Sequence, residues 1–406
     1  MTIQTKTTWR KRKLGEIAQD IRESYLPTKD EKKSYVGLEH IEQQTLQFFD
    51  VGRSDETQSA KKVFKAGDVL FGTLRPYFRK VVRPKFDGVC STDIAVIRPT
   101  QKGDGSFLKY FIANQDFIDY ASNIAGGTRM PRANWKTLKE TIWSLPELDK
   151  QKQIADVLSA YDDLIENNTK RIKILEQIAQ AIYREWFVHF RFPGHEKVKM
   201  IDSKTEFGKI PEGWEVKSIL VTEYFAFINE NIKRFMGSKI YYATADISGI
   251  TISGKGENIT FENKPSRAQK QPTIFSAWFA RMKDTYKVLG FTESNLDLAE
   301  NSVLSSGFAG FSSSKSVFPF LYYTINSEDF HRIKDLYCTG ATQMSLTNDG
   351  LEKILILEPI KKLIFDYGQK VLPMIDELFL LQKQNQNLRQ ARDLLLPKLV
   401  SGEIRI

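Results

Sequence analysis

Two long stretches with the residue spacing of paired helices constrain this chain more than any other feature. Between residues 148 and 187, apolar residues recur at alternating intervals of four and three, the pattern of a coiled-coil seam. The pattern recurs between residues 360 and 396 at an offset of 217 positions. The polar residue of the seam recurs at the same offset, since Asn385 corresponds to Asn168. A polar residue in such a seam lowers stability but fixes register. We therefore expect two long helices that pair with each other.

The residues expected to form this seam are mostly aliphatic. They are Ile154, Leu158, Tyr161, Ile165, Asn168, Ile172 and Leu175 on the first stretch, and Val371, Met374, Leu378, Leu381, Asn385 and Leu388 on the second. The alternative is two unrelated amphipathic helices, each lying on its own domain. The shared spacing and the shared asparagine favour pairing.

Size and composition bound the class of protein. A chain of 406 residues can form two or three domains, each with its own core. Two cysteines, Cys90 and Cys338, lie in unrelated apolar surroundings, which argues against disulfides and favours a reducing, cytoplasmic compartment. No secretory signal is visible and no apolar run approaches the roughly 18 residues of a membrane helix, so we expect no membrane partner. The net charge of +9 favours a polyanionic partner without identifying it.

The segments outside the long helices repeat as well. Gly340-Ala-Thr-Gln-Met344 corresponds to Gly126-Gly-Thr-Arg-Met130, and Trp214 corresponds to Trp9. Short apolar runs, such as residues 69–73, predict strands, residues 107–113 and 117–124 predict helices, and residues 9–21 predict a brief amphipathic helix. We interpret the chain as a tandem duplication of a mixed α/β domain followed by a long helix.

This interpretation gives explicit boundaries. Residues 1–147 and 211–358 are expected to form the globular domains, residues 148–190 and 359–406 the spacer helices, and residues 191–210 a linker. The expected fold class is mixed α/β, with two domains joined by two long antiparallel helices and related by a pseudo-two-fold axis. A parallel pair is the alternative, and the long linker does not forbid it. A helix of roughly 36 residues would span about 54 Å.

No catalytic motif is convincing. Gly249-Ile-Thr-Ile-Ser-Gly-Lys255 resembles the start of a phosphate-binding loop, but Gly256 stands where a hydroxyl must hold Mg²⁺. The four histidines lack the spacing of metal ligands. Glu31-Lys32-Lys33 matches only a fragment of a nuclease site. We predict no catalytic residue, no metal and no bound cofactor in this chain.

Loops that combine basic, aromatic and amide side chains predict contacts with double-stranded DNA. Arginine can bind guanine through two hydrogen bonds and glutamine suits adenine, while aromatic rings can stack on bases. The alternative for any one arginine is an ordinary surface ion pair. The candidates in the first half are Arg75, Tyr77, Arg79, Lys80, Thr128, Arg129 and Arg132, and those in the second are Lys255, Arg267, Lys270, Arg281, Lys283 and Gln343.

Four segments around the helices carry a family resemblance. They are residues 145–154, Ile182-Tyr-Arg-Glu-Trp-Phe-Val-His-Phe190, Gly208-Lys-Ile-Pro-Glu-Gly-Trp214 and Leu394-Leu-Leu-Pro-Lys-Leu-Val-Ser-Gly-Glu-Ile-Arg-Ile406. Together they resemble the DNA-specificity subunits of type I restriction-modification enzymes. The last segment is the most specific of the four.

The resemblance implies a non-catalytic chain that reads a bipartite, adenine-containing DNA site. Its helices would set the spacer and dock two modification subunits, which bring S-adenosylmethionine; restriction subunits, which use ATP and Mg²⁺, could join. Two other functions remain open at this stage. One is a stand-alone DNA endonuclease that uses carboxylates such as Glu31 or Asp93. The other is a protein-interaction scaffold.

Overall fold

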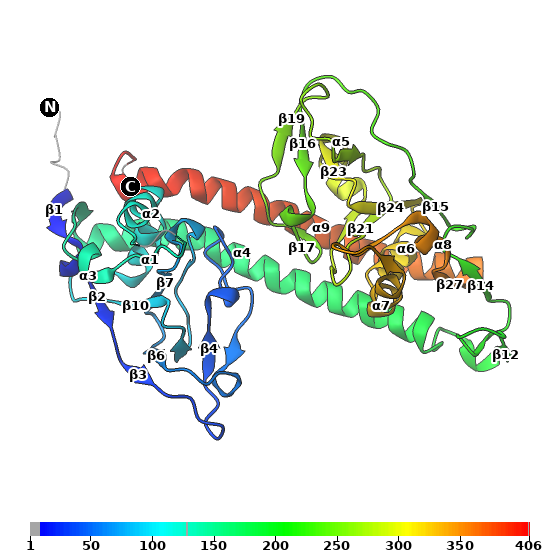
Figure 1. Cartoon of the computed structure of the whole chain (residues 1–406), viewed down its shortest axis with the longest axis horizontal. Coiled ribbons are helices and arrows are strands. Elements are labelled where there is room, and N and C mark those ends of the chain that lie inside the picture. The colour runs from blue at the N-terminus through cyan, green and yellow to red at the C-terminus, as the bar shows by residue number, and fades with distance from the viewer. Residues whose placement is uncertain (1–8, 127–128, 405) are drawn as a thin grey trace. The chain divides into compact units, whose positions relative to one another are not determined.

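The computed structural model describes residues 9–126, 129–404 and 406, which form two compact units. Unit 1 contains the described residues up to Glu166 together with Gln386–Ile406, and unit 2 is Asn167–Asn385. Each unit therefore combines one globular segment with parts of both long helices (Figure 1). The two units divide each long helix between them, whereas the boundaries expected from the sequence list residues 148–190 and 359–406 as segments of their own.

Unit 1 contains a two-stranded ribbon and two larger sheets. The ribbon pairs β1 (Trp9–Lys13) with β11 (Ile142–Pro146). The four-stranded sheet has the order β2 (Ala18–Ile21), β10 (Ile94–Pro99), β7 (Val69–Gly72) and β8 (Val81–Val82). The five-stranded sheet has the order β3 (Ser24–Tyr25), β6 (Lys61–Phe64), β9 (Gly88–Cys90), β4 (Ser34–Val36) and β5 (Gly52–Arg53), and its β4–β9 pair is parallel.

Helices cover the four-stranded sheet of unit 1 because their apolar faces complete its core. α1 (Gly105–Ala113) and α2 (Gln115–Asn123) bury Phe107, Phe111 and Phe117 against sheet residues such as Phe71. Asp104 caps α1 by accepting a hydrogen bond from the backbone of Phe107 at 2.8 Å. The short α3 (Trp135–Leu138) adds two more buried side chains to this core.

Unit 2 has a similar topology, with four strands where the second sheet of unit 1 has five. Its ribbon pairs β14 (Glu215–Ser218) with β27 (Leu355–Glu358). One four-stranded sheet has the order β15 (Phe225–Phe227), β24 (Phe308–Ser313), β21 (Ser276–Ala280) and β22 (Val288–Phe291). The other has the order β19 (Glu257–Ile259), β16 (Lys239–Tyr242), β23 (Ser302–Ser305) and β20 (Ala268–Lys270), with β16 and β23 parallel.

The helices of unit 2 follow the same sequence of elements as those of unit 1. They are α6 (Phe318–Ile325), α7 (Glu328–Leu336) and α8 (Asn348–Glu352), preceded by the additional α5 (Leu296–Asn301). Small antiparallel pairs join β12 (Met200–Asp202) to β13 (Lys209–Pro211), β17 (Ile247–Ser248) to β18 (Thr251–Ile252), and β25 (Cys338–Thr339) to β26 (Ser345–Leu346). The shared ribbon, sheet order and parallel pair confirm the predicted duplication.

Two long helices pass through both units. α4 (Leu148–Tyr183) continues as a π-helical turn over Arg184–Val188, and α9 is Lys361–Ser401. Within unit 1, Lys150 Nζ donates to the carbonyl of Ile406 at 2.7 Å and Asp162 pairs with Arg392 at 2.6 Å. Within unit 2, Asn385 Nδ2 donates to Thr169 Oγ1 at 3.2 Å, and Arg171 pairs with Glu377 at 2.6 Å. In each unit the two helices are therefore antiparallel, as predicted.

The predicted seam residues face inward. All thirteen are buried or half-buried, and Asn168 and Asn385 are only 6% and 3% exposed. Ile375, which was not among them, is more deeply buried than its neighbour Met374. The amide of Asn168 donates to Gln384 Oε1 at 3.4 Å, so each asparagine is oriented toward the opposite helix. No described helix is long and apolar enough to cross a bilayer.

The end of each long helix completes the core of the unit formed by the other repeat. Leu396, Leu399 and Val400 of α9 join the core of unit 1, while Ala179, Trp186 and Phe187 join that of unit 2. Gly402 ends α9 at a φ of +80°, and a Cβ there would lie 2.8 Å from the Trp9 ring. The motifs at residues 182–190 and 394–404 thus each contribute buried residues to a core.

The helix expected at residues 9–21 is wrong. This segment forms β1, a short 3-10 turn and β2. β1 pairs with β11 from Trp9 opposite Pro146 to Lys13 opposite Ile142, so the long-range partner decides the structure of a segment with weak local preference. Residues 249–255 lie around the β17–β18 hairpin and not at the start of a helix.

Leucines near the end of α9 test how much this docking stabilises unit 1. Leu396 is 1% exposed and Leu394 is 70% exposed. Leu396→Ala should lower the free energy of unfolding by about 2–5 kcal/mol because it leaves a cavity in the core. Leu394→Ala is the matched control and should change it by less than about 0.5 kcal/mol. Chemical denaturation followed by circular dichroism measures both; equal effects would contradict the docking.

Candidate nucleic-acid interface

Backbone hydrogen bonds join two loops of unit 1 into one surface. The first is the β7–β8 loop, residues 73–80, and the second is the 126–132 loop, of which residues 127 and 128 lie outside the described residues. Arg75 N donates to Pro131 O at 2.8 Å, and Ala133 N donates to Thr73 O at 3.0 Å. Arg75 and Arg79, both at a φ of +51°, flank the 3-10 turn Pro76–Phe78. Left-handed backbone at a non-glycine residue persists only where surrounding contacts hold it.

Several predicted contacts are exposed on this surface. Tyr77 is 48% exposed, and Arg129 and Arg132 are also exposed. Arg132 Nε lies 3.0 Å from Asp93 Oδ1, which orients its guanidinium. Arg75 is half-buried, with Cζ 6.0 Å from the centre of the Phe78 ring. Thr128 lies outside the described residues.

Unit 2 joins the corresponding loops in the same way. Lys283 N in the β21–β22 loop, residues 281–287, donates to Met344 O at 3.0 Å, and Leu346 N donates to Arg281 O at 2.9 Å. Asp284 has a φ of +53°. Gln343 is exposed in the β25–β26 loop, residues 340–344, and Lys283 is half-buried. Both units thus present a two-loop surface.

The chemistry of the two surfaces differs. The loops of unit 1 carry Arg75, Arg129 and Arg132, whereas those of unit 2 carry Lys283 and Gln343 at the corresponding places. A guanidinium donates to guanine in a planar fork, an amide both donates to and accepts from adenine, and an ammonium is suited to phosphate. Two similar frameworks therefore carry side chains suited to different bases.

Two residues of unit 1 that are predicted to contact DNA are bonded within the fold. Arg79 is only 9% exposed, and its Nε donates to Ala113 O, at the C-terminal end of α1, at 2.6 Å. Burial lowers the pKa of its guanidinium, and Asp393 at 3.5 Å partly offsets this. Lys80 is half-buried and donates to Leu38 O at 2.5 Å. Both residues hold the loop instead of facing solvent.

Two residues of unit 2 that are predicted to contact DNA are also bonded within the fold. Lys270 is 8% exposed and donates to the carbonyls of Asn229 and Glu230 at 3.0 and 3.2 Å. Arg281 donates to Leu346 O and to Asn348 Oδ1, each at 2.9 Å, and burial lowers the pKa of its guanidinium. The fold brings carbonyl oxygens beside these two cations, and the sequence does not show these contacts.

The two remaining candidates of unit 2 are exposed. Lys255 lies in the connection between β18 and β19. Arg267 precedes β20, and its carbonyl accepts a hydrogen bond from Ser306 N at 2.8 Å. The neighbouring Gly307 carbonyl accepts from Arg281 N at 2.9 Å, which places Arg267 beside the β21–β22 loop.

Sequence reasoning missed several residues of these surfaces. Tyr286 is 55% exposed on the β21–β22 loop, and its hydroxyl donates to Asp335 at 3.1 Å. Its ring packs edge-on against His331, whose burial lowers its pKa to about 4. Met130, Met282 and Met344 also lie exposed on the paired loops. The basic and aromatic pattern that selected the other candidates gives no weight to methionine.

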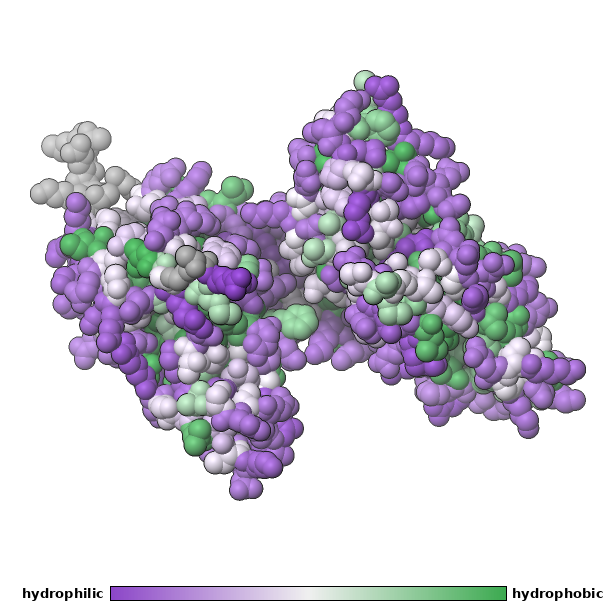
Figure 2. Space-filling view, viewed as in Figure 1, coloured by the Kyte–Doolittle hydropathy of each residue, from purple (hydrophilic) through white to green (hydrophobic). Residues whose placement is uncertain are grey.

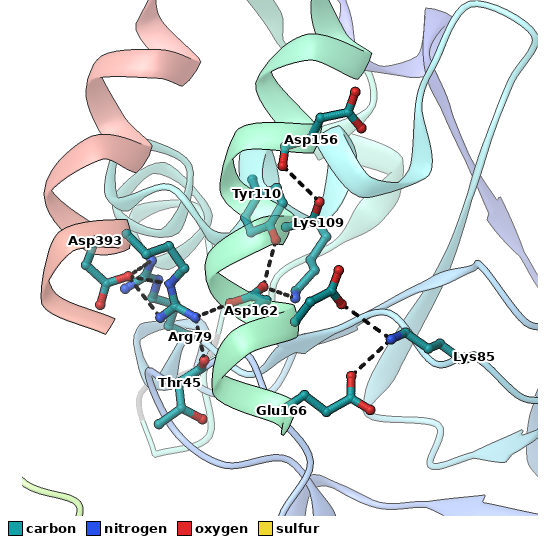
Figure 3. A network of polar contacts seen from close by, with 12 residues as sticks. Thr45, Arg79, Lys85, Lys109, Tyr110, Asp156, Asp162, Glu166 and Asp393 are labelled. Atoms are coloured by element: carbon teal, nitrogen blue, oxygen red, sulfur yellow. Dashed lines mark hydrogen bonds and ion pairs between the residues drawn. The ribbon is translucent and has the colours of Figure 1, made fainter. Parts of the chain in front are cut away.

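A buried ionic cluster lies behind the β7–β8 loop (Figure 3). Asp162 of α4 accepts hydrogen bonds from Lys109 at 2.5 Å, from Tyr110 at 2.7 Å and from Arg392 at 2.6 Å. Arg392 of α9 is fully buried and lies four residues after Leu388, at the next position of the helix seam. It also donates to Asp393 and to the Thr45 carbonyl, each at 3.0 Å. One cluster therefore joins α1, α4 and α9.

Opposing effects act on the carboxyl of Asp162. Burial alone would raise its pKa, but the positive charges of Lys109 and Arg392 and their hydrogen bonds hold it below the ordinary value. Burial, followed by the charge of Asp162, raises the pKa of Tyr110. Asp162 is therefore ionised, and Tyr110 is a donor.

The carboxylates considered for a nuclease have other partners. Glu31 pairs with Lys33 at 3.0 Å, whose hydrogen bond lowers the pKa of Glu31, and Asp93 pairs with Arg132. Within residues 9–126, 129–404 and 406, no group of three or more histidine, cysteine, aspartate and glutamate residues could hold a metal ion.

The outward faces of the long helices carry apolar side chains. Leu164 is exposed on α4 in unit 1, and Ile174, Ile178 and Leu380 are exposed in unit 2, each by 42–54%. The face of the molecule in Figure 2 is otherwise mostly hydrophilic, with apolar residues in small patches. Ile174 and Ile178 are four residues apart on α4 and so lie on one face of the helix, and exposed apolar residues that group together favour contact with a partner protein.

Comparison with known protein families finds one matching model. The model described as type I restriction modification DNA specificity domain matches residues 6–177. The match covers one of the two repeats, and the topology described above extends the same architecture to the other.

Relatives match over most of their length. The type I restriction enzyme MjaIX specificity subunit of Methanocaldococcus jannaschii is 28% identical over 313 residues, which cover 74% of this chain and 69% of the relative. The type I restriction enzyme HindI specificity subunit of Haemophilus influenzae is 24% identical over 412 residues, which cover 85% and 88%. The crystal structure of a type I restriction-modification system S subunit from M. genitalium aligns over 98% of both chains, with a TM-score of 0.55 and 16% identity, and shares the fold.

Asp162→Asn tests the buried cluster. The folded-state pKa of Asp162 lies below the unfolded value near 3.9, so its ionised form stabilises the fold above about pH 4, and this contribution is lost as pH falls through the folded-state pKa. The substitution leaves buried cations unpaired and should cost about 3–5 kcal/mol at neutral pH, less in acid. The neighbouring Asp163, 67% exposed beside Lys85, is the control, and Asp163→Asn should change little. Chemical denaturation at several pH values distinguishes them; equal effects would contradict the burial argument.

Proposed function

This chain belongs to the DNA-specificity subunits of type I restriction-modification systems, and on that premise we propose that each unit reads one half of a bipartite DNA site. The predicted family and the predicted role in DNA-sequence recognition are confirmed by that membership. So is the prediction that the chain is a specificity subunit and not an enzyme. The division of labour between the units is our proposal.

One observation carries the proposal. Two units with a similar topology present the same pair of backbone-linked loops, but with different side chains at corresponding places. A framework repeated with altered contact residues suits a protein that must recognise two different short sequences in one duplex. Arg129 with Arg132 in one unit and Gln343 in the other are our leading candidates for base contacts. Lys255 and Arg267, both exposed, are candidates for phosphate contacts.

The long helices supply the second part of the proposal. α4 has 36 residues and α9 has 41, lengths of about 54 and 62 Å at 1.5 Å per residue. These lengths exceed one turn of duplex, about 34–36 Å. We propose that the paired helices set the number of base pairs between the half-sites.

The partners follow from the same role. Two modification subunits would dock on the outward helix faces that expose Ile174, Ile178 and Leu380, and would methylate adenine in each half-site. Those subunits would bind S-adenosylmethionine, and restriction subunits, where they join, would bind ATP with Mg²⁺. In this proposal the chain itself contributes recognition and spacing, and acts in the cytoplasm.

Selection of DNA by the full chain tests the division between units. Duplexes retained from a random library should share a bipartite motif with an adenine in each half. Arg129→Ala should lower discrimination at one half-site by about tenfold, and Gln343→Ala should do so at the other, because each removes a base contact. Arg10→Ala, a 72% exposed arginine on β1, is the control. If either loop variant lowered discrimination at both half-sites, the proposal that each unit reads one half-site would be contradicted.

The spacer proposal predicts a change in length. Deleting one heptad from α4 and the facing heptad from α9 removes about 10 Å of helix. The preferred spacer should then shorten by about three base pairs, at 3.4 Å each. Sequencing of selected duplexes measures the spacer directly. An unchanged spacer with both half-sites retained would show that the helices do not set it.

A further inference from the structure

The β7–β8 loop of unit 1 is held from behind by a residue that cannot reach solvent. Arg79 ends the 3-10 turn in left-handed backbone and points inward. Its Nε bonds to the carbonyl of Ala113, one of the acceptors left unpaired at the end of α1. Its Nη2 lies 3.5 Å from Asp393.

This contact connects the loop to both long helices. Asp393 is also bonded to Arg392, which is bonded to Asp162 of α4. Arg392 further bonds to the carbonyl of Thr45, and the neighbouring Gln44 side chain donates to the carbonyl of Tyr77 at 3.1 Å. The loop that exposes Tyr77 is therefore held to the helices by two routes through charged or amide side chains. Figure 3 shows the route from Arg79 to Asp393.

Unit 2 holds its β21–β22 loop with different residues. Lys334 of α7 is fully buried and donates to the carbonyls of Met282 and Thr285 at 2.7 and 3.1 Å. Asp335, 3.0 Å from Lys334, accepts from Asp284 N at 3.2 Å and from the Tyr286 hydroxyl. Asp284 is the left-handed residue of this loop. A buried cation again supports strained backbone behind exposed side chains.

We propose that Arg79 and the Lys334–Asp335 pair are positioning residues for specificity. Arg79 fixes the β7–β8 loop of unit 1, and the pair fixes the β21–β22 loop of unit 2. Base preference then depends on charges that do not contact DNA. This rests on the proposed function. It assigns a role in base preference to residues that do not contact bases themselves. Specific base contacts need side chains held to within a few tenths of an ångström, and an exposed loop with left-handed residues does not hold itself.

Crossed substitutions test the inference. Arg79→Met and Lys334→Met, each in the full chain, should flatten base preference at different half-sites, by at least about fivefold. Each should leave the other half-site unchanged. The salt dependence of binding should also stay unchanged, because neither residue neutralises a phosphate. Selected-duplex sequencing and titrations at several salt concentrations give both readouts.

Base preference separates positioning from folding. It is a ratio among duplexes bound by the same folded molecules, so a loss of folded protein lowers total binding without changing it. Arg79→Lys retains a charge near Asp393 and should restore at least half of the preference. Where Lys334→Met does not fold, Asp335→Ala tests the same loop through Asp284 and Tyr286.

Three results would overturn the inference. Unchanged preferences with reduced stability would make both groups merely structural. A salt slope lower by about one for Arg79→Met would make Arg79 a phosphate contact. Loss of base preference at both half-sites in either variant would show that the support of one loop does not act on one half-site alone. A wild-type chain that enriches no bipartite motif fails the proposed function itself, which is a separate result, and the inference falls with it.

Discussion

The structure depends on the exchange of helix ends between repeats. The core of unit 1 is incomplete without Leu396, Leu399 and Val400 at the end of α9, and that of unit 2 without Trp186 and Phe187 after α4. Each repeat therefore folds around apolar side chains supplied by the other, and burial of such residues is the main driving force of folding. A chain built in this way cannot lose one repeat and leave the core of the other complete.

Polar groups along the helices make this exchange specific at a cost in stability. Asn168, Asn385 and Arg392 occupy seam positions where leucine would pack better. Asn168 and Asn385 donate to groups on the opposite helix, and Arg392 bonds across to Asp162 of α4 as well as to groups nearby. A shift by one turn would break these bonds between the helices. Register matters here because helices that slide would change the distance over which the proposed half-sites are spaced.

The sequence predicted the features that depend on periodicity and repetition. The heptad spacing predicted the two helices, their pairing and the seam position of Asn168. The repeated motifs predicted the duplication. Features that depend on distant partners were not predictable: residues 9–13 form a strand because β11 lies beside them, and Arg79 turns inward because Ala113 and Asp393 surround it. In the sequence Arg79 stands with Arg75 among aromatic residues and resembles it. Burial, which no local pattern encodes, separates the two.

Duplication followed by divergence explains how one framework can serve two recognition sites. The backbone bonds between the paired loops are the same in both units, so the shape of each surface is independent of the exposed side chains. Behind the loops the supports differ, with Arg79 in one unit and Lys334 with Asp335 in the other. Arg129 and Gln343 are exposed at the surface of these loops, where a side chain can change without filling or emptying a core. In this proposal, different residues hold each loop and contact the bases. One half-site can therefore change while the other half-site and the spacing stay fixed.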